Sequence, residues 1–219
     1  MAFVWVADRL YIATMYRLTA TDLTKRFGSR KVFSGVSFEV TTGQALAIVG
    51  PNGSGKSTLV MTLLGEVRPT RGSAVFADDA GILTETAIQR TTSLVSPYLN
   101  LYDSLSGEEN LVFFSQVEGA HTTGKQINAL LERVGLAGRG SDLVHTYSSG
   151  MKQRLKYALA LMNEPAFLFL DEPTSNLDDD GKRIVYDIIE EYTSRAIVVI
   201  ATNETEDQRF ASQFCRLDG

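Results

Sequence analysis

The first fifty residues change from an alternating pattern of apolar and polar positions to a continuous apolar run. Residues 16–23 and 32–40 alternate, with a turn signal at Gly28 and Ser29 between them. A period of two is typical of a strand with one buried face. Residues 45–49, ALAIV, are all apolar, as in a strand that is buried on both faces. We therefore predict a β-rich opening that leads into a buried strand.

The remainder of the chain mixes short apolar runs with segments of helical spacing. Further strands are expected at residues 73–77, 92–95, 167–170, 196–201 and 213–217, and helices at 59–64, 107–136, 151–162 and 180–192. The block of helical spacing that begins near residue 107 suggests a helical subdomain. Alternation of strands and helices elsewhere predicts parallel strands with helices packed outside them.

A glycine-rich loop separates the buried strand from the helix that follows it. Its sequence, GPNGSGKST, contains the complete pattern G-x-x-x-x-G-K-[ST] in the strand and helix context that the pattern requires. Glycines let successive backbone N–H groups converge on phosphate oxygens, and the helix N-terminus adds partial positive charge. The residues expected to bind nucleotide here are Gly50, Pro51, Asn52, Gly53, Ser54, Gly55, Lys56, Ser57 and Thr58.

Two carboxylates follow the apolar strand FLFL, at Asp171 and Glu172. The carboxyl ends of parallel strands form the edge of the sheet where ligands bind, so this pair should lie near the glycine-rich loop. We expect Asp171 and Ser57 to hold Mg²⁺. Glu172, one residue further on, is predicted to be the general base for a water that attacks the terminal phosphate, with Lys56 contacting that phosphate.

These motifs occur in an order that resembles the ABC ATPase nucleotide-binding domain from about residue 16 to residue 219. The resemblance implies an α/β fold, with a P-loop NTPase core of mainly parallel sheet, an N-terminal antiparallel β subdomain and an inserted helical subdomain at about 97–163. On this interpretation residues 15–219 form the ATPase domain. Residues 1–14 are an extension of unassigned role, and Met15 is an alternative start.

The same resemblance implies further site residues. Phe27, with Val32 nearby, stands where the family has an aromatic that stacks on adenine, although a core or surface Phe is the alternative. YSSGMKQRL resembles the LSGGQ signature, which caps ATP bound to an opposing subunit, and TSNLD resembles the D-loop. Both could instead be simple helix N-caps. The implied signature residues are Ser148, Ser149, Gly150 and Met151, and the implied D-loop residue is Asp178.

Three positions depart from the family pattern. Pro97 stands where the family generally carries a glutamine that touches Mg²⁺ and the attacking water. Asn203 replaces the usual histidine after the last switch threonine, and Ser149 replaces a signature glycine. Asn203 is assigned the catalytic role of that histidine, which makes a charge-assisted hydrogen bond to the γ-phosphate. Loss of such a bond costs about 1.5–3 kcal/mol, so we expect slower turnover.

The composition limits the classes of partner and the compartment expected for this chain. The net charge is −5, which argues against a broad electrostatic contact with nucleic acid, and the basic pairs Lys25–Arg26 and Arg30–Lys31 are interpreted as a solvated loop. The single cysteine, Cys215, fits a reducing compartment. No apolar run approaches the ~20 residues that cross a bilayer. Any link to a membrane must therefore come through a partner.

By resemblance, the chain is an ATP-hydrolysing subunit that dimerises, as a homodimer or pseudo-dimer, and powers a separate transmembrane permease, with export favoured. It would be cytoplasmic and peripheral on the inner face of the cell membrane. FSGVSF before the phosphate loop resembles haem, multidrug and lipid exporter ATPases. An alternative is a slow or degenerate ABC ATPase that acts as a nucleotide-gated dimerisation module. ABC proteins that act on DNA or ribosomes generally need a long coiled coil, a second ATPase domain or a basic surface, and this sequence shows none of these.

Overall fold

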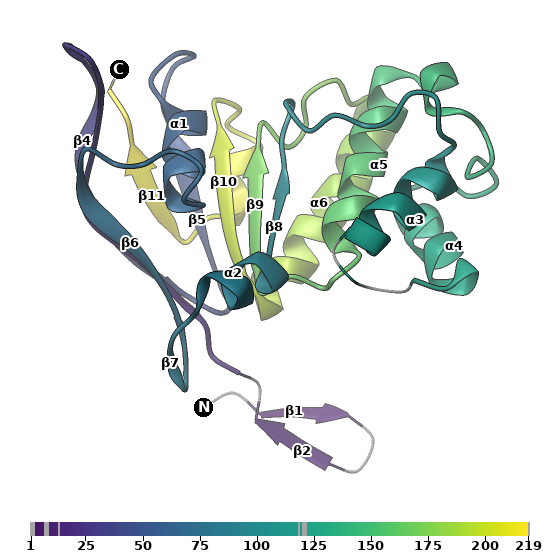
Figure 1. Ribbon diagram of the computed structural model, residues 1–219, viewed down its shortest axis with the longest axis horizontal. Coiled ribbons are helices and arrows are strands. Elements are labelled where there is room, and N and C mark those ends of the chain that lie inside the picture. Colours follow the sequence, from purple (N-terminus) through teal and green to yellow (C-terminus); the bar gives the residue numbers. More distant parts are fainter. Residues whose placement is uncertain (1–2, 7–8, 13, 118, 120–121, 219) are drawn as a thin grey trace.

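The computed structural model describes residues 3–6, 9–12, 14–117, 119 and 122–218. Within the N-terminal extension, β1 (Phe3–Val6) and β2 (Arg9–Ile12) pair with each other as an antiparallel hairpin. Figure 1 shows this hairpin beside the body of the molecule. The rest of the extension, residues 1–2, 7–8 and 13, and residues 118 and 120–121 of the expected helical subdomain, lie outside the described residues.

A parallel sheet forms the centre of the fold, in the order β11-β5-β10-β9-β8. Its strands are β5 (Gln44–Val49), β8 (Thr92–Val95), β9 (Phe167–Asp171), β10 (Ile197–Thr202) and β11 (Gln213–Arg216). The side chains of β9 alternate between two hydrophobic cores, because Leu168 and Leu170 pack into one core and Phe167 and Phe169 into the other. The sheet is therefore covered on both faces, as the continuous apolar runs predicted.

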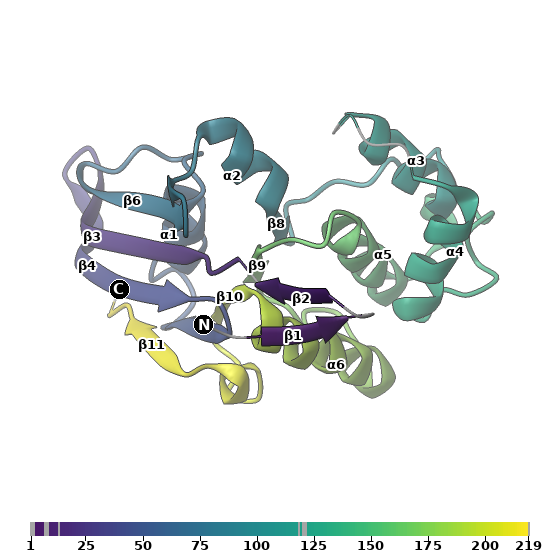
Figure 2. The ribbon, with the colours of Figure 1, turned by 90° about the horizontal axis from the view of Figure 1, so that it is seen from below.

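The two faces are covered by different structures (Figure 2). Helix α1 (Lys56–Leu63) packs between the parallel sheet and a second, antiparallel sheet in the order β4-β3-β6-β7. Helix α6 (Asp179–Arg195) packs on the opposite face. The antiparallel strands are β3 (Arg17–Phe27), β4 (Arg30–Thr41), β6 (Arg71–Asp78) and β7 (Gly81–Ile82). The N-terminal β subdomain is thus confirmed.

Between β8 and β9 the chain forms the inserted helical subdomain. It contains α3 (Gly107–Val117), α4 (Gly124–Arg133), the short helix η1 (Val144–Thr146) and α5 (Ser149–Leu161). The helical spacing expected over 107–136 is divided between α3 and α4, since Thr123 and Gln126 start α4 with a capping box. In the described part of the chain, no helix has the length and apolarity that crossing a membrane requires.

Helix α2 (Glu85–Thr91) and the short 3-10 helix η2 (Asp207–Phe210) are among the elements that were not predicted. Helix α2 begins at Thr84, whose hydroxyl caps the Ala87 N–H, but no residue of α2 is fully buried. It therefore lacks the apolar stripe on which a helix prediction depends. Helix η2 follows β10 and brings Asp207 into the interior. The predicted fold class is confirmed by the sheet order and by the placement of the helices.

Candidate nucleotide-binding site

A cleft of about 500 Å³ opens where β5 and β9 end and α1 begins. It is lined by the predicted metal ligand Asp171, by the predicted base Glu172 and by most of the predicted nucleotide-binding residues: Phe27, Val32, Asn52, Gly53, Gly55, Lys56, Ser57 and Thr58. Strands β5 and β9 flank β10 in the parallel sheet, so their ends are two strands apart. The sheet thus brings together a loop and an acid pair that are separated by more than a hundred residues in the sequence.

The phosphate loop holds its shape through two crowded glycines. Gly55 has a φ of 101°, and a Cβ there would collide with the Val32 side chain. A Cβ on Gly50 would collide with the Leu217 carbonyl and the Ser54 hydroxyl. Gly55 is also the N-cap of α1 and makes no side-chain capping bond, so the first N–H groups of the helix face the loop without a side-chain acceptor. This is the arrangement that binds anions at helix N-termini.

Lys56 is turned back onto the loop. Its Nζ donates to the Gly50 carbonyl at 3.0 Å and to the Pro51 carbonyl at 3.4 Å, and it lies 3.5 Å from Glu172 Oε1. The side chain is only 5% exposed. The ammonium group is therefore fixed between the phosphate loop and the acid pair, where a bound phosphate group could replace the loop carbonyls as its partner.

Asp171 ends β9 and is buried. Its Oδ1 atom is buried without a hydrogen-bond partner. Burial raises the pKa of Asp171, while the Ser57 hydroxyl and the Lys56 ammonium act to lower it. A buried carboxylate oxygen that lacks a partner and lies near a hydroxyl matches the oxygen ligands that Mg²⁺ prefers. The residues at this position therefore fit the expected metal.

Glu172 has an unusual backbone for its residue type, with a φ of 51°. Its N–H donates to the Ala201 carbonyl of β10 at 2.8 Å, which anchors this conformation. Burial raises the pKa of Glu172; the Lys56 ammonium opposes that shift and the Asp171 carboxylate adds to it. Non-glycine residues in the left-handed region are concentrated at functional sites. The side chain is directed to the cleft, which it lines together with Lys56.

Other predicted residues lie outside the residues that line this cleft. Asn203, with Gly50 and Pro51, lines a neighbouring pocket beside β11. Ser54 is buried within the loop, and its hydroxyl has no hydrogen-bond partner.

The signature and D-loop residues begin helices. The Ser148 hydroxyl accepts from the Met151 N–H at 3.2 Å and caps α5, of which Ser149 and Gly150 are the first residues. Asp178 caps α6 through the Gly181 N–H at 2.8 Å. The capping geometry named as the alternative is present at both positions, and Ser148 remains exposed. A serine that caps an exposed helix N-terminus is also compatible with anion binding.

The interpretation of the basic pairs as a solvated loop missed two contacts. Arg30 lines the cleft beside Phe27. The Lys25 ammonium lies 4.5 Å from the centroid of the Phe27 ring, which is 55% exposed. Both cations stand close in sequence to the predicted adenine-stacking residue. Their proximity to Phe27 was the available signal, and it was outweighed by the general rule that short basic runs are solvated.

Sequence reasoning also missed Asp207. This fully buried carboxylate accepts hydrogen bonds from Thr202 Oγ1 at 2.7 Å, Thr174 Oγ1 at 3.1 Å and Tyr186 Oη at 3.1 Å. Burial is the main cause of the raised pKa of Tyr186, and the carboxylate adds to it. Asp207 thus joins the residue before Asn203 to the segment that follows Glu172. Thr174 and Tyr186 are distant from Asp207 in sequence, so no local pattern identifies the network.

The chain is similar in sequence to proteins of a known family. A family model described as ABC transporter matches residues 33–175. The doxorubicin resistance ATP-binding protein DrrA of Mycobacterium tuberculosis is 33% identical over 191 residues, which are 85% of this chain and 58% of that protein. The Nod factor export ATP-binding protein I of Rhizobium etli is 30% identical over 209 residues, which are 94% of this chain and 66% of that protein. The chain thus spans less than two thirds of the length of these relatives.

Solved structures agree in fold. A chain described as the ATP binding subunit of an ABC transporter superposes with a TM-score of 0.79 at 25% identity, covering 92% of this chain and 85% of that one. A bacterial Atm1-family ABC exporter with ATP bound gives the same TM-score at 22% identity, with 95% of this chain and 38% of that chain covered, and it supports the fold alone. Because the family model matches more than half of its residues, this chain belongs to the ABC transporter family.

Proposed function

We propose that this chain binds Mg·ATP in the cleft, hydrolyses it and thereby powers export through a separate transmembrane subunit. One observation carries the proposal. The Lys56 ammonium lies 3.5 Å from the Glu172 carboxylate, next to a buried Asp171 oxygen that has no protein partner. The Lys56 cation, the Asp171 oxygen as a candidate metal ligand and the Glu172 carboxylate as a candidate base are therefore grouped at the N-terminus of α1.

Binding would use groups that are already in place. The phosphate loop amides and the α1 N-terminus would bind the β- and γ-phosphates, and Lys56 would exchange its loop carbonyls for phosphate oxygens. At the other end of the cleft, the exposed ring of Phe27 would stack on the base, with Val32 beside it. Because the loop is formed before nucleotide arrives, little backbone ordering is needed on binding.

Ser57 and Asp171 would hold the Mg²⁺ ion, which neutralises charge on the phosphate oxygens when it is bound. Glu172 would accept the proton of the attacking water. Its raised pKa makes it a stronger base than an ordinary glutamate, and its strained backbone fixes the carboxylate beside Lys56. A positioned general base contributes a factor of about 10²–10⁴ to the rate.

The remaining site residues support a dimer. Ser148 to Met151 lie at the exposed N-terminus of α5, outside the cleft of their own chain. We infer that they cap the γ-phosphate of ATP bound to an opposing subunit, with Asp178 nearby in the D-loop. Two copies would then close head to tail around two nucleotides, and Asn203 would contact the γ-phosphate as they close.

The membrane partner would dock on the surface formed by residues 97–110. Tyr98 and Tyr102 are exposed there, and Tyr102 packs edge-to-face on Phe113 at 4.8 Å, so the surface carries accessible aromatic area. Names such as doxorubicin resistance and Nod factor export describe relatives of this chain and favour export. The chain would thus be peripheral on the inner face of the membrane.

A second candidate function is a nucleotide-gated dimerisation module with very slow hydrolysis. Two observations favour it: Pro97 offers no side-chain amide where it lines the cleft, and Asn203 lies in the neighbouring pocket. The intact set of Lys56, Ser57, Asp171 and Glu172 favours the hydrolytic function instead.

Single-turnover phosphate release separates the two functions. In the hydrolytic case the wild type releases phosphate at least about 10²-fold faster than Glu172→Gln, because that change removes the base. Equal rates in the two proteins, together with ATP-dependent dimerisation, would favour the module. Copurification from detergent extracts then tests transport: a bound polytopic membrane protein is expected, and its consistent absence would contradict the assignment to a transporter.

A further inference from the structure

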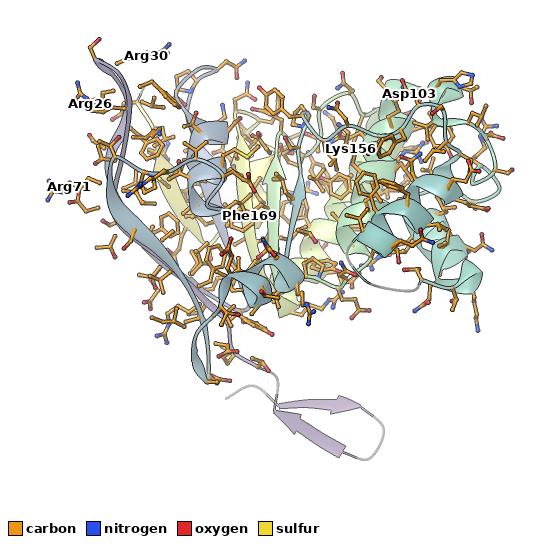
Figure 3. The ribbon with its side chains drawn as sticks, viewed as in Figure 1. Arg26, Arg30, Arg71, Asp103, Lys156 and Phe169 are labelled. Carbon is orange, nitrogen blue, oxygen red and sulfur yellow. The ribbon has the colours of Figure 1, made fainter. Side chains whose placement is uncertain are left out.

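Lys156 reaches from the helical subdomain to the end of β8. Its Nζ donates to the Ser96 and Pro97 carbonyls, each at 3.1 Å. The side chain leaves α5 in its third turn and is labelled in Figure 3, where it points to the segment that follows β8. Lys156 is half-buried, and burial lowers its pKa. The ammonium group thus links two parts of the molecule through backbone oxygens.

The two carbonyls belong to the turn that forms one edge of the cleft. Ser96 is buried directly after β8, and the next two residues, Pro97 and Tyr98, line the cleft. The turn is closed by the Leu99 N–H, which donates to the Ser96 carbonyl at 3.2 Å. Lys156 therefore binds the same carbonyl that closes the turn.

A second contact along the same face of α5 reinforces this link. Ser148, Lys152 and Lys156 follow one another at intervals of four residues, so they lie in one row along the helix. Lys152 Nζ pairs with Asp103 Oδ1 at 2.6 Å. The row begins at the exposed Ser148 and ends, about 12 Å further along the helix, at the turn beside the cleft.

We propose that Lys156 is a positioning residue that fixes the cleft edge at Pro97 and Tyr98 to the signature helix α5, so that a displacement of α5 moves this edge. Proline at position 97 has no side-chain donor or acceptor, and its carbonyl is held from outside instead. The identity of the ligand in the cleft rests on the proposed function; the mechanical link itself rests only on the Lys156 contacts.

A matched control lies two residues earlier on the same helix. Arg154 Nη1 also donates to two backbone carbonyls, those of Val134 at 3.1 Å and Gly135 at 2.7 Å. Val134 is the C-cap of α4 and Gly135 follows it, so both carbonyls lie inside the helical subdomain. Removal of Arg154 therefore costs a similar pair of charged hydrogen bonds without releasing the cleft edge.

The experiment compares the full chain with Lys156→Met, Lys156→Arg and Arg154→Met by residue-resolved hydrogen exchange, ATP binding and single-turnover hydrolysis. In Lys156→Met, we expect exchange of the Leu99 amide to rise about tenfold and hydrolysis to fall about tenfold, the scale of one charge-assisted hydrogen bond. The ATP dissociation constant should stay within about twofold, since the phosphate loop is untouched. Arginine keeps the positive charge and offers several N–H donors, so Lys156→Arg should restore both values.

Arg154→Met should accelerate exchange near Gly135 and leave the Leu99 amide and the hydrolysis rate unchanged. Unchanged Leu99 exchange in Lys156→Met would overturn the link, and faster exchange with normal hydrolysis would overturn its positioning role. Equal losses of hydrolysis in Lys156→Met and Arg154→Met would reduce Lys156 to a structural contact. If the wild type binds ATP without releasing phosphate, the proposed function fails, and Leu99 exchange then decides the link by itself.

Discussion

The two sides of the cleft are built in different ways. Asp171 and Glu172 lie at the end of β9, and Lys56 begins α1 after the loop that follows β5, so the parallel sheet fixes where this side of the cleft starts. Pro97 and Tyr98, at the opposite edge, form a turn held by a lysine from α5. We call the first the sheet side, because the parallel sheet positions it. We call the second the helical side, because it depends on the position of the helical subdomain. Substitutions on the sheet side should alter the chemistry, and those on the helical side should alter its coupling to subunit closure.

Glu172→Gln tests the sheet side and has the largest expected effect. Single-turnover hydrolysis should fall about 10²–10⁴-fold while ATP binding is retained, because glutamine keeps the size of the side chain and loses the base. The wild-type rate should also fall on acidification. Burial raises the pKa of Glu172 above its ordinary value of 4.5, and the protonated form is inactive, so the loss begins at a higher pH than for an exposed glutamate.

A normal hydrolysis rate in Glu172→Gln would break the comparison, because the sheet side would then not carry the chemistry. Lys56→Met serves as the control for binding. It should weaken ATP affinity, which the glutamine variant leaves intact, and titration calorimetry of both variants measures the difference.

Asp207→Asn tests the connection between the two strand ends on the sheet side. The buried carboxylate accepts from Thr202, Thr174 and Tyr186, and an amide cannot accept at both of its polar atoms. The free energy of unfolding should fall by about 2–3 kcal/mol, as measured by urea denaturation. Tyr186→Phe, which removes one donor only, should cost about 1 kcal/mol. An unchanged midpoint in both variants would mean that the network does not stabilise the fold.

Asn203→His tests the proposed contact between position 203 and the γ-phosphate. The histidine should strengthen this contact and so sharpen the comparison. A protonated or neutral imidazole could donate to the γ-phosphate more strongly than the amide, so we expect hydrolysis to rise by up to about tenfold. Steady-state phosphate release with saturating ATP measures the change. Asn203→Ala is the control and should lower the rate; if histidine lowers it as well, the position does not contact the phosphate.

Ser149→Gly tests the helical side and has the smallest expected effect. Serine adds a Cβ at the start of α5, where we propose that a phosphate of the opposing subunit binds. Its removal should tighten the ATP-dependent dimer by about two- to threefold, which is below 1 kcal/mol. Analytical ultracentrifugation in Glu172→Gln, where ATP persists, provides the measurement. Weaker dimerisation in Ser149→Gly would place the contact elsewhere.

Most of the sheet side was predictable from the sequence, because its information is local. The glycine spacing around Lys56 predicts a phosphate loop, and the acidic residues after FLFL predict the end of a buried strand. Ligands bind at the carboxyl ends of parallel strands, so the two motifs are expected to lie close together. Helix α2 and the Asp207 network were not predictable. The former has no buried stripe, and the partners of the latter come from β10, α6 and the segment after β9. The Lys156 contact was missed because its acceptors are backbone carbonyls, which have no sequence signature.

At Glu172 the stability of the fold and the activity favour different residues, because the backbone there is left-handed. Glycine would adopt a φ of 51° without strain, whereas a non-glycine residue there costs on the order of 1 kcal/mol or more. The substitution that best suits the main chain is thus one that discards the carboxylate. Variants selected only for thermal resilience should drift toward glycine at this site, and a screen for stability alone would collect inactive proteins.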